Sequence, residues 1–402
     1  MILMIDYLID FIKNIDFNKL IDFKIVKNDE SSRIKLYEYI DYVVDKQIEN
    51  NRVELREISI RESISRFDNI FAIDSSSRTV DTPYLFVAIG STTCINRFRN
   101  IYIDYPDITS VFSKRNTHYR YIVLIPEITG LSETQFNELK NNGIIIDNPN
   151  GIIYDSKYSK YVVLDELRLR LENNMLEIIL SDDRIRDSYI FIDGAIYYTP
   201  PVIYHYNELH SIRDKYIKEY IESWKILVCR RIELINKLYS EKNNYVIGIV
   251  KRLQRSNLLS RIDPLNISTG SLNDETYLSI YIDKLIRENS VKPYTIGPLL
   301  YNPSSDLVKL PVKRIYYFAI PRRTGLIENS LKTYVFFRAE ALYNDNEWIK
   351  PIIYDTIYSG STIPLSILLA DSRARKITHA FTNYFIVKTG LSRESTSFYI
   401  TL

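Results

Sequence analysis

The sequence predicts an α/β fold in which a mixed sheet is flanked by helices. Apolar, β-rich runs alternate with long helical segments, and the connections between them are mostly short and polar. That order is typical of a sheet with helices packed on its faces. With 402 residues, 46% apolar and 25% charged, the chain has the size and composition of a globular protein with an ample core.

The first 65 residues are predicted to form helices that pack on the core or on a second subunit. The run MILMIDYLIDFIKNI is interrupted by Asp6, Asp10 and Lys13, which argues against a membrane span. Apolar positions recur at helical spacing, namely Ile5, Leu8, Ile9 and Ile12. We therefore expect an amphipathic N-terminal helix and a cytoplasmic protein.

Residues 66–402 are predicted to form one compound domain, since no convincing linker interrupts them. Four β-rich runs between 69 and 125 predict an antiparallel meander. A helix is expected at 165–180, a strand at 191–198, a long helix at 207–242 and a strand at 245–252. Residues 256–310 read as a mostly helical insertion. A late strand pair follows, and then a helix with Thr362 as N-cap.

Charge and cysteine content exclude two classes of site. The 52 basic and 50 acidic residues give a net charge of +2, so any basic binding surface must be local. Cys94 and Cys229 lie far apart in the sequence and form no metal-binding spacing, which indicates two thiols in a reducing compartment.

Four carboxylates occur in an order that suits a metal site. Asp74 and Asp193 each follow an apolar run that predicts a buried strand, and we expect each to end its strand. A glutamate of the intervening helix, Glu172 or Glu177, and Asp371 of the late helix would complete the set. Hard divalent cations such as Mg²⁺ and Mn²⁺ bind oxygen ligands that converge from different elements.

Each carboxylate also has a simpler interpretation. A strand-end aspartate before serine or glycine often forms a turn. The helical glutamates could lie on a solvated face, and Asp371 could pair with Arg375 one helical turn away. The order of the four residues favours the metal site more than any single residue does.

Five stretches resemble the NurA nuclease family, whose core is ribonuclease H-like: FAIDSSSR, RLRLENNML, FIDGAIYY, VIGIVKR and IPLSILLADSRARKI. The resemblance implies that Asp74, Glu172 and Asp193 are catalytic metal ligands and that Lys251 is the family's strand lysine. Asp371 stands where the family usually has histidine. An aspartate can still bind a hard metal, so we expect activity to survive with this change.

The resemblance implies a DNA nuclease that hydrolyses phosphodiesters with two Mn²⁺ or Mg²⁺ ions. It further implies single-strand endonuclease and 5′–3′ exonuclease activity on single- and double-stranded DNA. A homodimer would act with a HerA-type hexameric ATPase in DNA end resection and repair. The chain has no GxxxxGK[ST] stretch, so ATP-driven movement would come from the partner. Two alternatives are a catalytically silent DNA-binding adaptor of the same fold and an RNA-cleaving enzyme.

Basic residues after the strand at 245–250 predict a path for DNA. Lys251, Arg252, Arg255 and Arg261 lie in one short segment, and phosphate contacts of this kind provide most non-specific affinity. Lys251 is the candidate to neutralise the scissile phosphate. His379 lies about 12 Å along a helix from Asp371, so we interpret it as structural.

Overall fold

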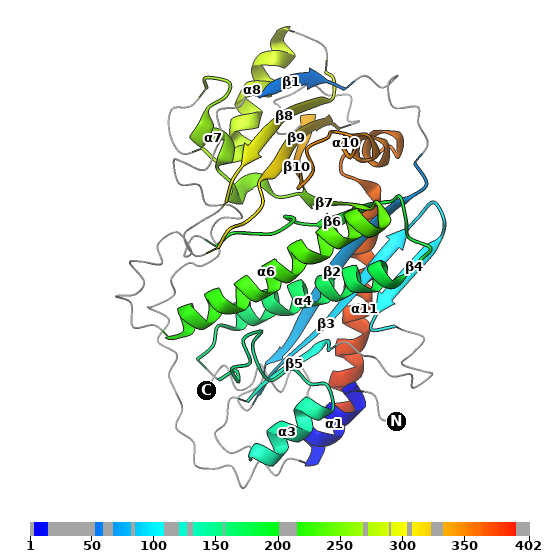
Figure 1. Ribbon diagram of the computed structural model, residues 1–402, viewed down its shortest axis with the longest axis vertical. Coiled ribbons are helices and arrows are strands. Elements are labelled where there is room, and N and C mark those ends of the chain that lie inside the picture. Colours follow the sequence, from blue (N-terminus) through cyan, green and yellow to red (C-terminus); the bar gives the residue numbers. More distant parts are fainter. Residues whose placement is uncertain are drawn as a thin grey trace.

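The computed structural model describes residues 4–14, 53–58, 67–81, 85–107, 120–126, 132–155, 157–200, 215–267, 272–288, 291–303, 308–322 and 333–390. Ten strands of this part form one sheet (Figure 1). They are β1 (Glu54–Glu57), β2 (Ile70–Asp81), β3 (Leu85–Asn96), β4 (Ile101–Tyr105), β5 (Ile122–Pro126), β6 (Tyr189–Asp193), β7 (Tyr245–Val250), β8 (Tyr294–Tyr301), β9 (Lys313–Pro321) and β10 (Tyr334–Ala341).

The strand order is β1-β8-β9-β10-β7-β6-β2-β3-β4, with β5 also paired to β3. Only β7, β6 and β2 are mutually parallel, and the other pairs are antiparallel. The predicted mixed sheet flanked by helices is therefore confirmed, and β4-β3-β2-β6-β7 is the part that corresponds to the expected ribonuclease H-like core.

Two sets of helices cover opposite faces of this core. Helices α4 (Lys160–Ser181) and α6 (Lys215–Lys242) lie together on one face, and α11 (Leu365–Thr389) crosses the other (Figure 1). Adjacent residues of β3 show the alternation that a strand imposes. A Cβ atom at Gly90 would lie 2.5 Å from Leu171 of α4, whereas the Ser91 hydroxyl donates to the Ala374 carbonyl of α11 at 2.9 Å.

The remaining helices are short or peripheral. They are α1 (Met4–Asn14), α3 (Glu133–Asn141), η5 (Leu253–Arg255), α7 (Leu258–Ile262), α8 (Asp274–Glu288), α10 (Ile349–Ile353) and the π-helical turn η6 (Tyr354–Tyr358). The expected N-terminal helix is present as α1, it buries the predicted apolar positions, and it packs on α11. Among the described helices, none is both long enough and apolar enough to cross a bilayer.

A second hydrophobic core lies between β8–β10 and helices α7 and α8 (Figure 1). It encloses four fully buried charged residues, which we call the ionic network: Asp274, Lys313, Arg338 and Glu340. Lys313 pairs with Glu340 at 3.2 Å, and Arg338 pairs with Glu340 and, at 3.9 Å, with Asp274. Two cations thus neutralise two carboxylates, as burial away from water requires.

Two predicted elements are wrong, and a third is incomplete. β2 does not end at Asp74 but continues through the serines to Asp81, because β3 pairs with it along that whole length. Residues 54–57, expected to be helical, form β1 on the edge of β8. The insertion at 256–310 contributes β8 to the sheet as well as helices.

Two predicted connections also differ. β5 pairs with the first half of β3 rather than continuing the meander from β4, which occupies the second half of β3. Thr362 does not cap α11. Instead, the Asp355 carboxylate of η6 accepts from the Ser366 amide at 2.8 Å and from its hydroxyl at 3.0 Å, which satisfies donors of the first turn.

Candidate active site

A cavity of about 500 Å³ lies where the pairing of β2 with β6 ends. The parallel pairing of these strands ends at Ile73 and Ile192, while β2 runs on beside β3. Residues from β2, α4, β6, α6, the segment after β7 and α11 line the cavity. Its size is in the range of pockets that hold small ligands.

Strand register explains why three charged residues share one face of the sheet at this point. Asp74 and Asp193 each follow the last matched pair of β2 and β6, so their side chains leave the sheet on the same side. Asp193 is also paired with Ile249 of β7. Lys251 is two residues beyond Ile249 and therefore faces the same side.

Asp371 reaches this face from α11. Carboxylate oxygens of Asp74, Asp193 and Asp371 lie within 4.8 Å of one another, and we call these residues the carboxylate cluster. The Asp371 carboxylate also pairs with Arg375 at 2.5 Å, as the simpler interpretation anticipated, but its side chain is only 18% exposed. The contact of Asp355 with Ser366 fixes the start of α11 and thereby the position of Asp371.

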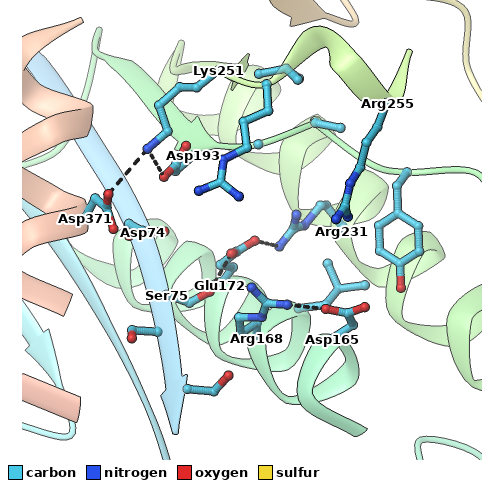
Figure 2. Close-up of a pocket in the computed structure, with 18 of the residues that line it drawn as sticks. Asp74, Ser75, Asp165, Arg168, Glu172, Asp193, Arg231, Lys251, Arg255 and Asp371 are labelled. Atoms are coloured by element: carbon cyan, nitrogen blue, oxygen red, sulfur yellow. Dashed lines mark hydrogen bonds and ion pairs between the residues drawn. The ribbon is translucent and has the colours of Figure 1, made fainter. Parts of the chain in front are cut away.

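Lys251 places its ammonium group against the carboxylate cluster (Figure 2). Its Nζ lies 2.5 Å from Asp193 and 3.5 Å from Asp371. Together with Arg375 on Asp371, Lys251 gives the cluster two cations for three carboxyl groups.

Burial and the neighbouring carboxylates raise the pKa values of two aspartates. Burial, together with the charges of Asp193, Glu172 and Asp371, raises the pKa of Asp74 to about 9. Burial also raises the pKa of Asp193, and Lys251 opposes that shift. A divalent cation beside Asp74 and Asp193 would favour their ionised forms and so stabilise the site.

Glu172 lies in the same cavity but outside the three-aspartate group. Its two oxygens are engaged by the Ser75 hydroxyl at 2.6 Å and by the guanidinium of Arg231 at 2.6 Å (Figure 2). Ser75 follows Asp74 on β2, so its side chain points to the opposite face of the sheet, which is covered by α4. Glu172 is a residue of α4 and therefore meets Ser75 there. Glu177, the other helical candidate, instead pairs with Arg230 at 2.6 Å and does not line the cavity.

The basic segment after β7 extends along the cavity. Arg252 and Arg255 line it together with Lys251, whereas Arg261 lies on α7 and is not among the lining residues. His379, as expected, is not in the cavity and contacts Arg78 at 2.8 Å.

Two glycines allow the chain to turn after Asp193. Gly194 has φ +115°, which a residue with a side chain rarely adopts. A Cβ atom at Gly248 would lie 2.4 Å from the Ile196 backbone nitrogen, so only glycine permits this close approach. The turn keeps the chain beyond Asp193 close to β7 as it leaves the sheet.

Sequence reasoning missed the two helical arginines of the cavity, Arg168 on α4 and Arg231 on α6. Arg231 has a side chain only 3% exposed, which no single-sequence pattern indicates in a helix rich in lysine and arginine. Arg168 precedes Glu172 by one helical turn. This spacing could have indicated that Arg168 lies on the same helix face as the predicted ligand Glu172.

Comparison with known proteins identifies relatives. The family model for the NurA domain matches residues 68–375, which is more than half of the chain. The crystal structure of the NurA nuclease from Sulfolobus solfataricus is similar, with 13% identity, a TM-score of 0.42, and coverage of 83% of this chain and 88% of that one. No curated protein matches the chain.

A crystal structure of NurA with manganese shares 10% identity at a TM-score of 0.41, covering 81% of this chain and 89% of that one. A crystal structure of NurA bound to dAMP and manganese shares 10% identity at a TM-score of 0.38, covering 78% of this chain and 87% of that one.

Proposed function

The chain belongs to the NurA family, and from that premise we propose that it is a metal-dependent deoxyribonuclease. One observation carries the proposal: three aspartates from separate elements place their oxygens within 4.8 Å of one another. A polar wall and basic residues surround them in a cavity large enough for a nucleotide unit.

Asp74, Asp193 and Asp371 are the residues that would hold the cation. Their donor set, oxygen alone, suits Mn²⁺ or Mg²⁺, and manganese is the ion named for two of the similar structures. A bound divalent ion would lower the pKa of a water molecule and stabilise charge on the phosphate. A divalent ion would offset the cost of ionising these carboxyl groups, since burial and the neighbouring carboxylates raise the pKa of Asp74 to about 9.

Glu172 is the available fourth ligand for the two-ion form of the mechanism. Its bonds to Ser75 and Arg231 would have to rearrange before it bound a second ion. In its present position Glu172 keeps the buried Arg231 paired, and the pair forms part of the cavity wall.

Lys251, Arg252 and Arg255 are proposed to bind DNA. The ammonium group of Lys251 is held beside the carboxylates, where it would also meet the scissile phosphate. Arg252 and Arg255 would contact the strand farther along the cavity.

We carry over from the family the finer activities and the partners. The enzyme would cut single strands internally and degrade single- and double-stranded DNA from 5′ ends. It would act as a homodimer with a HerA-type hexameric ATPase in end resection and repair.

The test is cleavage of end-labelled single-stranded DNA in Mn²⁺, Mg²⁺ or EDTA, by the wild type and by an Asp74→Ala, Asp193→Ala double variant. We expect cleavage that needs the metal and disappears in the variant. Asp81→Ala is the matched control, because Asp81 lies on the same strand but pairs with Lys160 outside the cavity. DNA binding without cleavage in any metal, with or without the ATPase, would instead support the silent adaptor.

A further inference from the structure

The cavity has two chemically different ends (Figure 2). The carboxylate cluster lies at one end with Lys251. At the other end, arginines from different elements approach the same space, and Figure 2 shows Arg168, Arg231 and Arg255 there. Metal ligation accounts for the first end and leaves the second unexplained.

Arg168 enters the cavity from α4. Asp165, Arg168, Leu169 and Glu172 all line it, and their spacing of three, four and seven residues places them on one face of the helix. Arg168 lies about 6 Å along the helix axis from Glu172, at 1.5 Å per residue. Its guanidinium group pairs with Asp165, and its side chain remains 46% exposed. It is therefore accessible to a ligand.

Arg255 approaches from the opposite wall. It lies close enough to Asp165 for its charge to lower the pKa of that carboxyl, although burial raises the pKa overall. Within the part of the chain that the structure describes, neither Arg252 nor Arg255 forms a salt bridge or a side-chain hydrogen bond. Arg231 is paired with Glu172, which leaves Asp165 as the carboxylate beside Arg168 and Arg255, two guanidinium groups that exceed it in charge.

The backbone that carries Arg255 is rigidly anchored. The next residue, Ser256, accepts a hydrogen bond from Arg338 at 2.9 Å and donates one to Asp274 at 2.5 Å, both within the buried ionic network. The Asp274 carboxylate also accepts from the Leu259 amide at 2.8 Å. A side chain that must receive a ligand at a fixed point benefits from such an anchor.

We propose that Arg168 and Arg255, with Arg252, form a second phosphate subsite, which binds a phosphodiester adjacent to the one at the carboxylate cluster. Arginine binds phosphate through paired donors, and planar guanidinium groups suit that contact better than lysine. Asp165 occupies the position of the phosphate in the absence of substrate. The inference rests on the proposed nuclease function, and it specifies the substrate as a strand with at least two phosphates.

The test compares a substrate that has a neighbouring phosphate with one that does not. A thymidine oligonucleotide has it, and bis(p-nitrophenyl) phosphate has a single phosphodiester. For Arg168→Gln, we expect kcat/KM to fall at least tenfold more on the oligonucleotide than on the small diester, mainly through KM. Binding of the labelled oligonucleotide with Ca²⁺ in place of Mn²⁺ should show a salt dependence whose slope is smaller by about 0.7.

Two further variants keep the test sharp. Asp165→Asn should lower the KM for the oligonucleotide, whereas Arg168→Gln raises it, because Asp165→Asn removes the carboxylate that competes with phosphate. Arg186→Gln is the matched control, because Arg186 pairs with Asp183 at the same three-residue spacing on an exposed surface, and it should behave as the wild type.

The outcomes separate the two hypotheses. An equal loss by Arg168→Gln on both substrates, or a weakening by Asp165→Asn as large as that of Arg168→Gln, would overturn the subsite while leaving the nuclease intact. A wild type that hydrolyses neither substrate in any metal would overturn the nuclease function, and the subsite with it.

Discussion

The carboxylate cluster and the ionic network are two groups of buried charges with opposite balance. In the ionic network, Lys313 and Arg338 offset two carboxylates, and all four side chains are fully buried. In the carboxylate cluster, three aspartates are contacted by Lys251 and by the largely exposed Arg375. The ionic network pairs each buried carboxylate with a cation, whereas the carboxylate cluster gathers more carboxyl groups than cations, and Asp74 is held with a raised pKa there.

The largest expected effect comes from removing a charge of the carboxylate cluster. Asp371→Asn should lower metal-dependent cleavage about 10³-fold, because a ligand that contributes several kcal/mol to charge stabilisation is lost. Asp371→His, which replaces an oxygen ligand by a nitrogen ligand, should retain activity with a changed preference between Mn²⁺ and Mg²⁺. Steady-state rates in each metal measure both. Full activity of Asp371→Asn would show that Asp371 is not a metal ligand.

Breaking the ionic network should instead cost stability. Arg338→Met leaves Glu340 and Asp274 without their shared cation, which we expect to lower the free energy of unfolding by about 3–5 kcal/mol. Urea denaturation measures the change. Arg186→Met, which breaks an exposed pair, should cost less than about 1 kcal/mol. Similar losses of unfolding free energy in Arg338→Met and Arg186→Met would show that the buried ionic network contributes no more stability than an exposed ion pair.

Metal addition should distinguish the two groups directly. At about 100 times its Kd, Mn²⁺ should stabilise the wild type by about 2.7 kcal/mol, because it binds the folded carboxylate cluster. An Asp74→Asn, Asp193→Asn variant should show no such gain, while Asp81→Asn should behave as the wild type. Thermal denaturation with and without Mn²⁺ provides the measurement, and an equal gain in all three proteins would place the ion elsewhere.

Another buried carboxylate, Glu166, loses its charge by holding a proton. Burial raises its pKa to about 7, although Tyr154 and Tyr158 donate hydrogen bonds to it at 2.5 and 2.7 Å. The folded state therefore holds a proton that the unfolded state has already lost above its pKa of about 4.5. The stability due to this proton is complete below pH 4.5 and falls as the pH rises to about 7.

Glu166→Gln should remove that pH dependence, which we expect to amount to about 2–3 kcal/mol between these limits. Urea denaturation at several pH values compares the two proteins. A wild type and a variant with parallel pH profiles would show that Glu166 is ionised in the folded protein.

The sequence predicted the mixed sheet and the convergence of Asp74, Asp193 and Asp371, but not every strand pairing. Asp74 and Asp193 were recognisable because each interrupts an apolar run, and strand register then fixes their common face. The pairing of β5 with β3 and of β1 with β8 depends on contacts between distant segments, which local patterns do not encode. Arg168 and Arg231 were missed because an arginine on a helix has the same local pattern whether it faces water or a cavity.

The continuity of the sheet from β1 to β4 has a consequence for how the protein opens. β10 bonds to β7 along Arg338–Glu340, so the second core and the ribonuclease H-like core share one hydrogen-bonded ladder. Amide hydrogens of β7 and of β10 should therefore exchange with solvent at closely similar rates, in one cooperative event. We therefore expect the basic segment after β7 and the carboxylate cluster to be lost in the same opening event.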